Sequence, residues 1–87
     1  MDIKKVAKAG TLESNDIYIL IMPSEEKGIE LDLESIVMKQ FGEEIRKVIL
    51  ETLKELKVES AIVKAQDKGA LDYTIKARVE TAVKRAQ

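Results

Sequence analysis

The chain has 87 residues, 15 of them basic and 16 acidic, and it contains neither cysteine nor histidine. This length suits one domain, and the missing cysteines exclude disulfides and thiolate metal sites. Without histidine, a serine–histidine–acid triad cannot form. The net charge of −1 and an aromatic content of 3% argue against a nucleic-acid-binding face. We therefore expect no catalytic residues and no metal ligands.

No signal peptide is visible at the start of the chain, and the longest apolar run, residues 17–22, is too short to span a membrane. The absence of cysteine suits a reducing compartment. We therefore expect a soluble, cytoplasmic protein that does not bind membranes.

The first half of the chain predicts three strands. Residues 4–13 have weak strand patterning, whereas residues 16–22 are rich in β-branched side chains and predict a central strand covered at least partly on both faces. Between them, Glu13-Ser14-Asn15-Asp16 suits a tight turn, because asparagine tolerates left-handed backbone. This pattern predicts a β-hairpin with Ser14 at its tip. Residues 29–33 alternate apolar and acidic side chains and predict a half-buried strand.

Residues 36–57 predict a long amphipathic helix, with Ser35 as its N-cap. Because they recur at helical spacing, the following residues are expected on its buried face: Phe41, Ile45, Val48, Ile49, Thr52, Leu53 and Leu56.

The last third of the chain predicts one more strand and one more helix. Residues 58–65 alternate, and residues 70–86 carry an apolar stripe that begins at Leu71. Asp67 is the expected cap of this helix, and Asp72 suits its first turn. The order β-β-β-α-β-α predicts an α+β two-layer sandwich of about four strands, with both helices packed on one face of an antiparallel or mixed sheet.

Four serines are candidates for covalent attachment of a group: Ser14, Ser24, Ser35 and Ser60. The chain lacks a histidine to activate a serine, but a separate modifying enzyme would supply the base. Its target must be exposed, and a hairpin tip meets this need better than a helix cap or a strand. Ser14 is therefore the first candidate and Ser24, in a polar loop, the second. The alternative interpretation is an ordinary turn serine.

The segments Gly10-Thr11-Leu12-Glu13-Ser14 and Asp67-Lys68-Gly69-Ala70-Leu71-Asp72 resemble the acyl carrier (gamma) subunits of citrate lyase. The resemblance covers about residues 3–86 and includes residues 39–42, 49–51 and 77–80. It leads us to expect glycine at position 15, where this chain has Asn15; both residues suit a turn.

The resemblance implies that Ser14 carries phosphoribosyl-dephospho-coenzyme A through a phosphodiester, attached by a dedicated transferase. The thiol of that group would hold acetyl, which the citrate lyase alpha subunit exchanges for citryl. The beta subunit would cleave the citryl thioester to oxaloacetate with a divalent metal. Residues 1–87 would then form one acyl carrier domain that makes and breaks no bonds itself. Glu13 and Asp16 are expected either to guide the transferase or to keep the turn in solvent.

Two other functions fit the sequence. The same carrier role in a related lyase, such as citramalate lyase, cannot be distinguished from the sequence. A protein-interaction module with unmodified Ser14 is the alternative from a different class.

Overall fold

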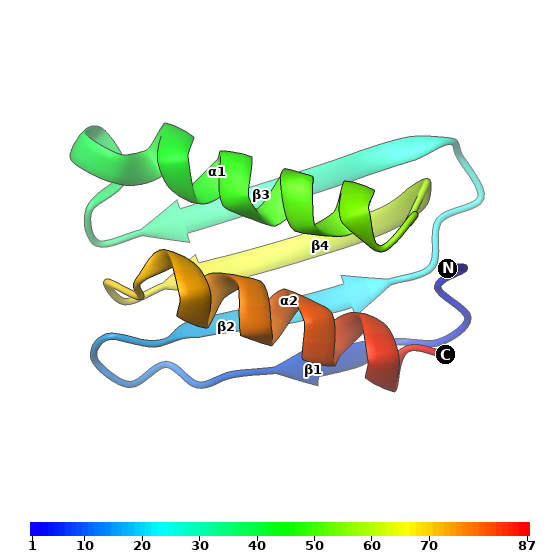
Figure 1. Cartoon of the computed structure of the whole chain (residues 1–87), viewed down its shortest axis with the longest axis horizontal. Coiled ribbons are helices and arrows are strands. Elements are labelled where there is room, and N and C mark those ends of the chain that lie inside the picture. Colours follow the sequence, from blue (N-terminus) through cyan, green and yellow to red (C-terminus); the bar gives the residue numbers. More distant parts are fainter.

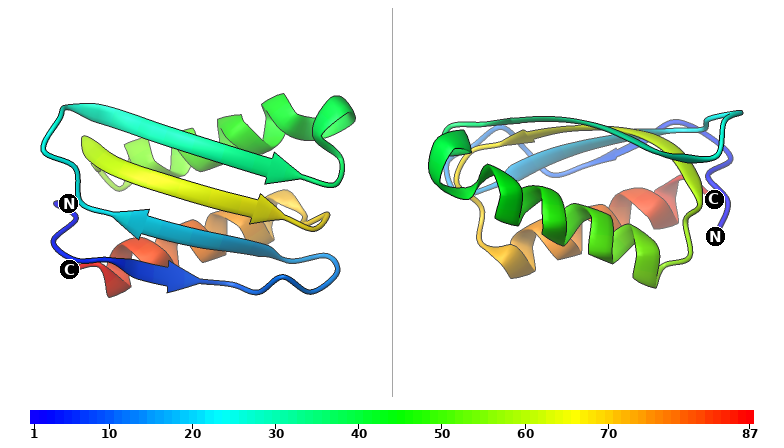
Figure 2. Two further views of the ribbon diagram at one scale, coloured as in Figure 1. Left: turned by 180° about the vertical axis from the view of Figure 1, so that it is seen from behind. Right: turned by 90° about the horizontal axis from the view of Figure 1, so that it is seen from above.

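The computed structural model describes residues 1–87 and contains four strands and two helices in the predicted order. They are β1 (Ala7–Ala9), β2 (Ile17–Met22), β3 (Gly28–Ser35), α1 (Met38–Glu55), β4 (Ser60–Asp67) and α2 (Asp72–Arg85). The strands form one layer, and both helices lie against the same face of it (Figures 1 and 2). The predicted α+β sandwich is therefore confirmed.

The sheet is mixed, with the strand order β1-β2-β4-β3. β2 pairs antiparallel with β1 and with β4, whereas β3 pairs parallel with β4. A parallel pair needs a crossover connection, and α1 supplies it between β3 and β4. β2 is central, as predicted, but helices cover only one of its faces. Tyr18, Leu20 and Met22 on the other face are half-buried.

The core lies between the sheet and the helices. Side chains that share a register across the strands, such as Ile19 with Ala65 and Ile21 with Val63, point toward the helices and are fully buried. The helices add these buried residues: Ile45, Ile49, Leu53, Ile75, Val79, Ala82 and Val83. Neither helix has the length and apolar composition that a membrane span requires.

β1 is shorter than predicted, because the backbone on both sides of it leaves the ladder. Gly10 has φ +87°, a left-handed conformation that ends the strand. Before the strand, the amides of Lys4 and Lys5 both donate to the carbonyl oxygen of Ala86, next to the C-terminus. The two termini therefore lie side by side, at the end of the molecule opposite the β1–β2 turn (Figure 1).

The predicted apolar stripes are wrong at the start of both helices. Phe41 is 55% exposed and Leu71, the residue before α2, is 58% exposed. Both residues lie at the end of the molecule, beyond the buried core. The apolar pattern of the sequence therefore continues there, although the side chains themselves are left exposed. These two side chains belong to the end of the molecule that carries Ser14.

Candidate attachment site

Three segments meet at the end of the molecule opposite the termini (Figure 1). They are the β1–β2 turn (residues 10–16), the β4–α2 loop (residues 68–71) and the start of α1. The amide of Asn15 donates to the carbonyl of Lys68 over 2.8 Å, and the amide of Lys68 donates back to the carbonyl of Asp16 over 2.9 Å. This reciprocal pair joins the turn to the loop.

Ser14 lies in the turn that follows Glu13, and its side chain is exposed, as predicted. Its hydroxyl makes no hydrogen bond within the chain. The side chain of Ser14 is also more exposed than those of the other three serines, which are only half-exposed. Ser24 exchanges hydrogen bonds with the backbone of Glu26. Ser14 is thus the one serine whose hydroxyl is both exposed and free of internal partners at a loop tip. Its neighbour Asn15 adopts φ +65°, which gives the turn its left-handed residue.

Asp16 braces the turn from inside and does not face solvent. Its carboxylate accepts two hydrogen bonds from the Arg78 guanidinium (3.0 Å from Nε, 2.9 Å from Nη2) and one from the Thr11 hydroxyl (2.7 Å). The amide of Ile17 donates a fourth over 2.7 Å. Neither expected role of Asp16, guiding a transferase or solvating the turn, agrees with this burial. Asp16 instead fixes the base of the turn against α2.

The charge of Arg78 determines how Asp16 titrates. The hydrogen bonds from the guanidinium lower the pKa of Asp16 to about 2, helped by Thr11 and the Ile17 amide and opposed by burial. The same pairing raises the pKa of Arg78 above its ordinary value. Both groups are therefore charged at neutral pH, where Asp16 and Arg78 form an ion pair that braces the turn.

Ser35 and Asp67 organise the neighbouring loop, but not as the helix caps that were predicted. Ser35 is the last residue of β3; its hydroxyl donates to Asp67 (2.8 Å) and accepts from the Val37 amide (3.0 Å). The buried carboxylate of Asp67 also accepts from the amides of Gly69 and Ala70. Neither helix has a side-chain cap. The pair instead shapes the loop on which the Ser14 turn rests.

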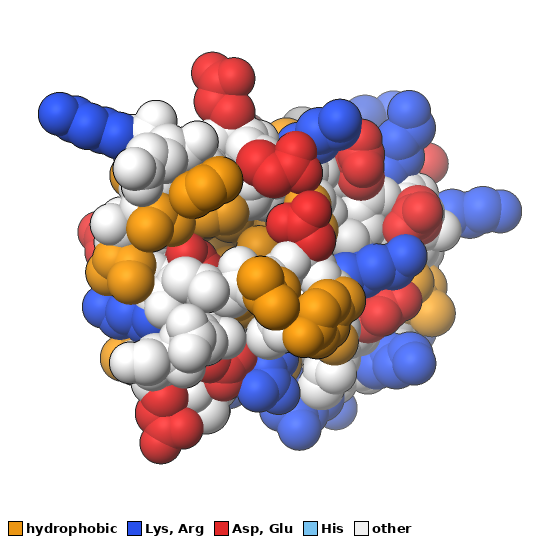
Figure 3. All heavy atoms as spheres, turned by 60° about the vertical axis from the view of Figure 1, so that its left-hand side comes forward, with side chains coloured by type: hydrophobic (Ala, Val, Ile, Leu, Met, Phe, Trp, Pro, Cys, Tyr) orange, Lys and Arg blue, Asp and Glu red, His pale blue; other side chains and the backbone are white.

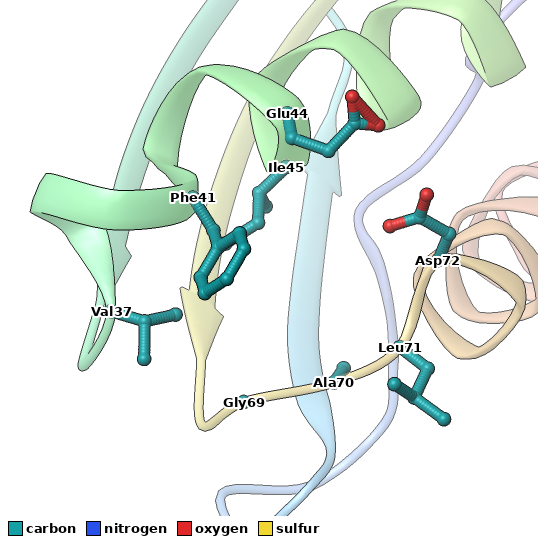
Figure 4. A pocket seen from close by; sticks show the side chains of 8 residues that line it. All are labelled: Val37, Phe41, Glu44, Ile45, Gly69, Ala70, Leu71 and Asp72. Atoms are coloured by element: carbon teal, nitrogen blue, oxygen red, sulfur yellow. The ribbon is translucent and has the colours of Figure 1, made fainter.

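A groove of about 390 Å³ lies between the start of α1 and the β4–α2 loop (Figure 4). Its eight lining residues are Val37, Phe41, Glu44, Ile45, Gly69, Ala70, Leu71 and Asp72. Hydrophobic side chains also gather in patches on this end of the surface, with acidic side chains between them (Figure 3). No group of three or more His, Cys, Asp or Glu side chains is placed to hold a metal ion.

Arg78 is the residue of the site that sequence reasoning missed. It precedes the buried Val79 on α2 and lies 62 positions from its partner Asp16. A charged residue beside an apolar stripe was the available signal, because such a side chain needs a partner or a route to water. The sequence alone did not indicate which carboxylate that partner is.

Comparison with known proteins places the chain in a family. Residues 4–86 match the family model described as malonate decarboxylase delta subunit. A citrate lyase acyl carrier protein of Streptococcus mutans is 63% identical over 99% of this chain and 84% of its own length. The chain belongs to the citrate lyase acyl carrier protein family. Another member, from Halothermothrix orenii, is 50% identical over 99% of this chain and 90% of its own length. The chain is accordingly an acyl carrier.

The fold of this family member also occurs in a solved structure. A chain in the crystal structure of a Pseudomonas malonate decarboxylase hetero-tetramer in complex with malonate superposes with a TM-score of 0.79. The match covers 98% of this chain and 87% of the other, at 16% identity. It establishes a shared fold.

Proposed function

We propose that the chain is the carrier subunit of citrate lyase and that Ser14 bears phosphoribosyl-dephospho-coenzyme A through a phosphodiester. The observation that carries this proposal is the Ser14 hydroxyl, which is exposed at a loop tip and free of internal hydrogen bonds. The names of relatives that are 50–63% identical support a citrate lyase carrier over the same role in another lyase.

The residues present fit such a group. A transferase that takes the proton of the Ser14 hydroxyl can join the oxygen to an activated phosphate, which loses its leaving group. The group would supply a terminal thiol, which a chain without cysteine lacks, and would hold acetyl or citryl there as a thioester. Asp16, Arg78 and Thr11 hold the turn rigidly, so the anchor stays in place while the arm moves.

The position of Ser14 at one end of the molecule suits delivery to more than one partner. The partners proposed are the alpha subunit, which exchanges acetyl for citryl, and the beta subunit, which cleaves citryl. Tethering replaces two bimolecular encounters by intramolecular ones, at effective concentrations on the order of millimolar. In this scheme the chain holds and presents the acyl group, and its partners perform the chemistry.

Intact-mass measurement tests the attachment. The chain is produced with the prosthetic-group transferase and its precursor, and its mass is expected to rise by that of the group. Ser14→Ala is expected to stay at the unmodified mass, while the control Ser24→Ala, at the other loop serine, gains the full adduct. Unmodified wild-type protein would favour the unmodified interaction module, and an adduct on Ser14→Ala would place the attachment elsewhere.

A further inference from the structure

The groove between α1 and the β4–α2 loop adjoins the turn that carries Ser14. A Cβ atom added at Gly69, in the groove wall, would lie 3.7 Å from Oδ1 of Asn15. The preceding residue, Lys68, exchanges both of its backbone hydrogen bonds with the turn. The opening of the groove is thus one residue from the attachment point, and a flexible group anchored on Ser14 has direct access to it.

The lining of the groove is mostly apolar, although it faces solvent. Phe41 and Leu71 are each more than half exposed, in positions that continue the core stripes of their helices. Ile45, which is buried, forms part of the floor. Exposed apolar side chains that gather around a hollow mark a binding site, and a volume of about 390 Å³ lies within the range of small-molecule sites.

The charges at the groove limit which chemistry it accepts. Glu44 and Asp72 lie on opposite sides of it, with their carboxylates turned toward each other, and no Lys or Arg lines it (Figure 4). Two carboxylates repel phosphate, so they disfavour the nucleotide part of a coenzyme-A-derived arm in this groove. The same carboxylates accept hydrogen bonds from amide N–H groups. The groove therefore suits a neutral chain with apolar segments and amides.

We infer that this groove holds the neutral, amide-bearing part of the arm on Ser14 between reactions and shields the thiol at its end; this inference rests on the proposed function. Weak affinity is enough, because the arm is tethered. With an effective concentration of about 1–10 mM and a dissociation constant of about 1 mM, the reactivity of the thiol falls about 2- to 10-fold. An acyl group with its own carboxylates would be repelled by Glu44 and Asp72, so citryl would occupy the groove less than acetyl.

The absence of cysteine makes this inference directly measurable, because the only thiol of the modified protein is that of the arm. The rate of reaction with an aromatic disulfide reagent is measured on the modified protein, after intact mass has established the adduct. Phe41→Ala is expected to raise the rate at least 2-fold. The matched control is Tyr73→Ala, since Tyr73 is 73% exposed and lies outside the groove lining.

Backbone amide chemical shifts give a second readout that does not depend on the thiol. Amides 69–72 are expected to shift between the unmodified and the modified protein, and to shift less in Phe41→Ala. Equal thiol rates in wild type and Phe41→Ala, with unchanged amide shifts, would overturn the inference and leave the proposed function intact. If Phe41→Ala then weakened binding to the catalytic subunits, the groove would be a protein-docking surface. Absence of the adduct would overturn both proposals.

Discussion

The ion pair between Asp16 and Arg78 gives the sharpest test of how the attachment turn is held. In Asp16→Asn the charge is lost, and because Arg78 donates to both carboxylate oxygens, the new amide NH₂ group must face a donor. The lowered pKa of Asp16 corresponds to about 2 kcal/mol of stabilisation by its surroundings. The Asp16 side chain is 12% exposed and that of Arg78 39%, so water screens the pair and reduces the ionic share to about 1–2 kcal/mol.

The unfavourable amide–donor approach adds roughly 1 kcal/mol. We therefore expect Asp16→Asn to lower the free energy of unfolding by about 2–3 kcal/mol, and the melting temperature by at least about 8 °C in a chain of this size. Denaturant unfolding followed by far-ultraviolet circular dichroism measures the first quantity. The Ser14 turn should also become mobile, which slows modification by the transferase in the Asp16→Asn protein.

A double-mutant cycle isolates the pair itself. Asp16→Asn, Arg78→Gln and their combination are expected to show a coupling of about 1–2 kcal/mol. The matched control is Lys76 with Glu55, whose charged atoms lie 3.4 Å apart with side chains 49% and 62% exposed. There the coupling should be at most about 0.5 kcal/mol. A coupling at Asp16 no larger than this control value would refute the argument.

Three further predictions concern the pH dependence of the Asp16 stabilisation, the conformation of Gly10 and the hydrogen bonds of Ser35. The folded-state pKa of Asp16 lies below its ordinary value of 3.8, so the stabilisation that this carboxylate contributes is complete above about pH 4 and is lost as the pH falls toward 2. The free energy of unfolding of Asp16→Asn should therefore depend less on pH across this window than that of the wild type. Gly10→Ala should destabilise the fold by at least about 3 kcal/mol in thermal melts, because the added Cβ would lie 1.8 Å from the Ile17 carbonyl oxygen. The control Gly28→Ala, which also has a left-handed backbone but open space around it, should cost about 1–2 kcal/mol. Equal costs for the two variants would show that the clash at Gly10 does not matter. Ser35→Ala removes the hydrogen bonds to Asp67 and from Val37 and should cost about 1–2 kcal/mol in denaturant unfolding. A loss below about 0.5 kcal/mol, the level of an ordinary surface substitution, would count against this role of Ser35.

The parts of the fold that the sequence predicted well depend on local patterns. The β-branched run of β2 ends at Pro23, and its predicted limits differ from the observed ones by a single residue. Asn15 suits a turn by its own conformational preference, and the turn forms where it was expected. Such features depend on a few neighbouring residues, which is why the sequence is informative about them.

The features that were missed depend on residues far apart in the chain. Ser35 has the chemistry of an N-cap, but Asp67, 32 positions away, takes its hydroxyl and keeps it in the loop network. Phe41 fits an apolar stripe, yet whether a stripe is covered depends on where the sheet ends. The insertion of β4 between β2 and β3 likewise depends on the crossover through α1, so the sequence left an antiparallel and a mixed sheet equally open.

The neighbouring termini have a practical consequence for studying this carrier. Both ends of the chain lie at the end of the molecule opposite the β1–β2 turn and the β4–α2 loop (Figure 1). The α-amino group of Met1 donates to the carbonyls of Leu56 and Lys57, so an affinity tag or fluorophore there would disturb contacts that the chain uses. A label after Gln87 avoids them and leaves the opposite end clear for the transferase and for any enzyme that collects the cargo.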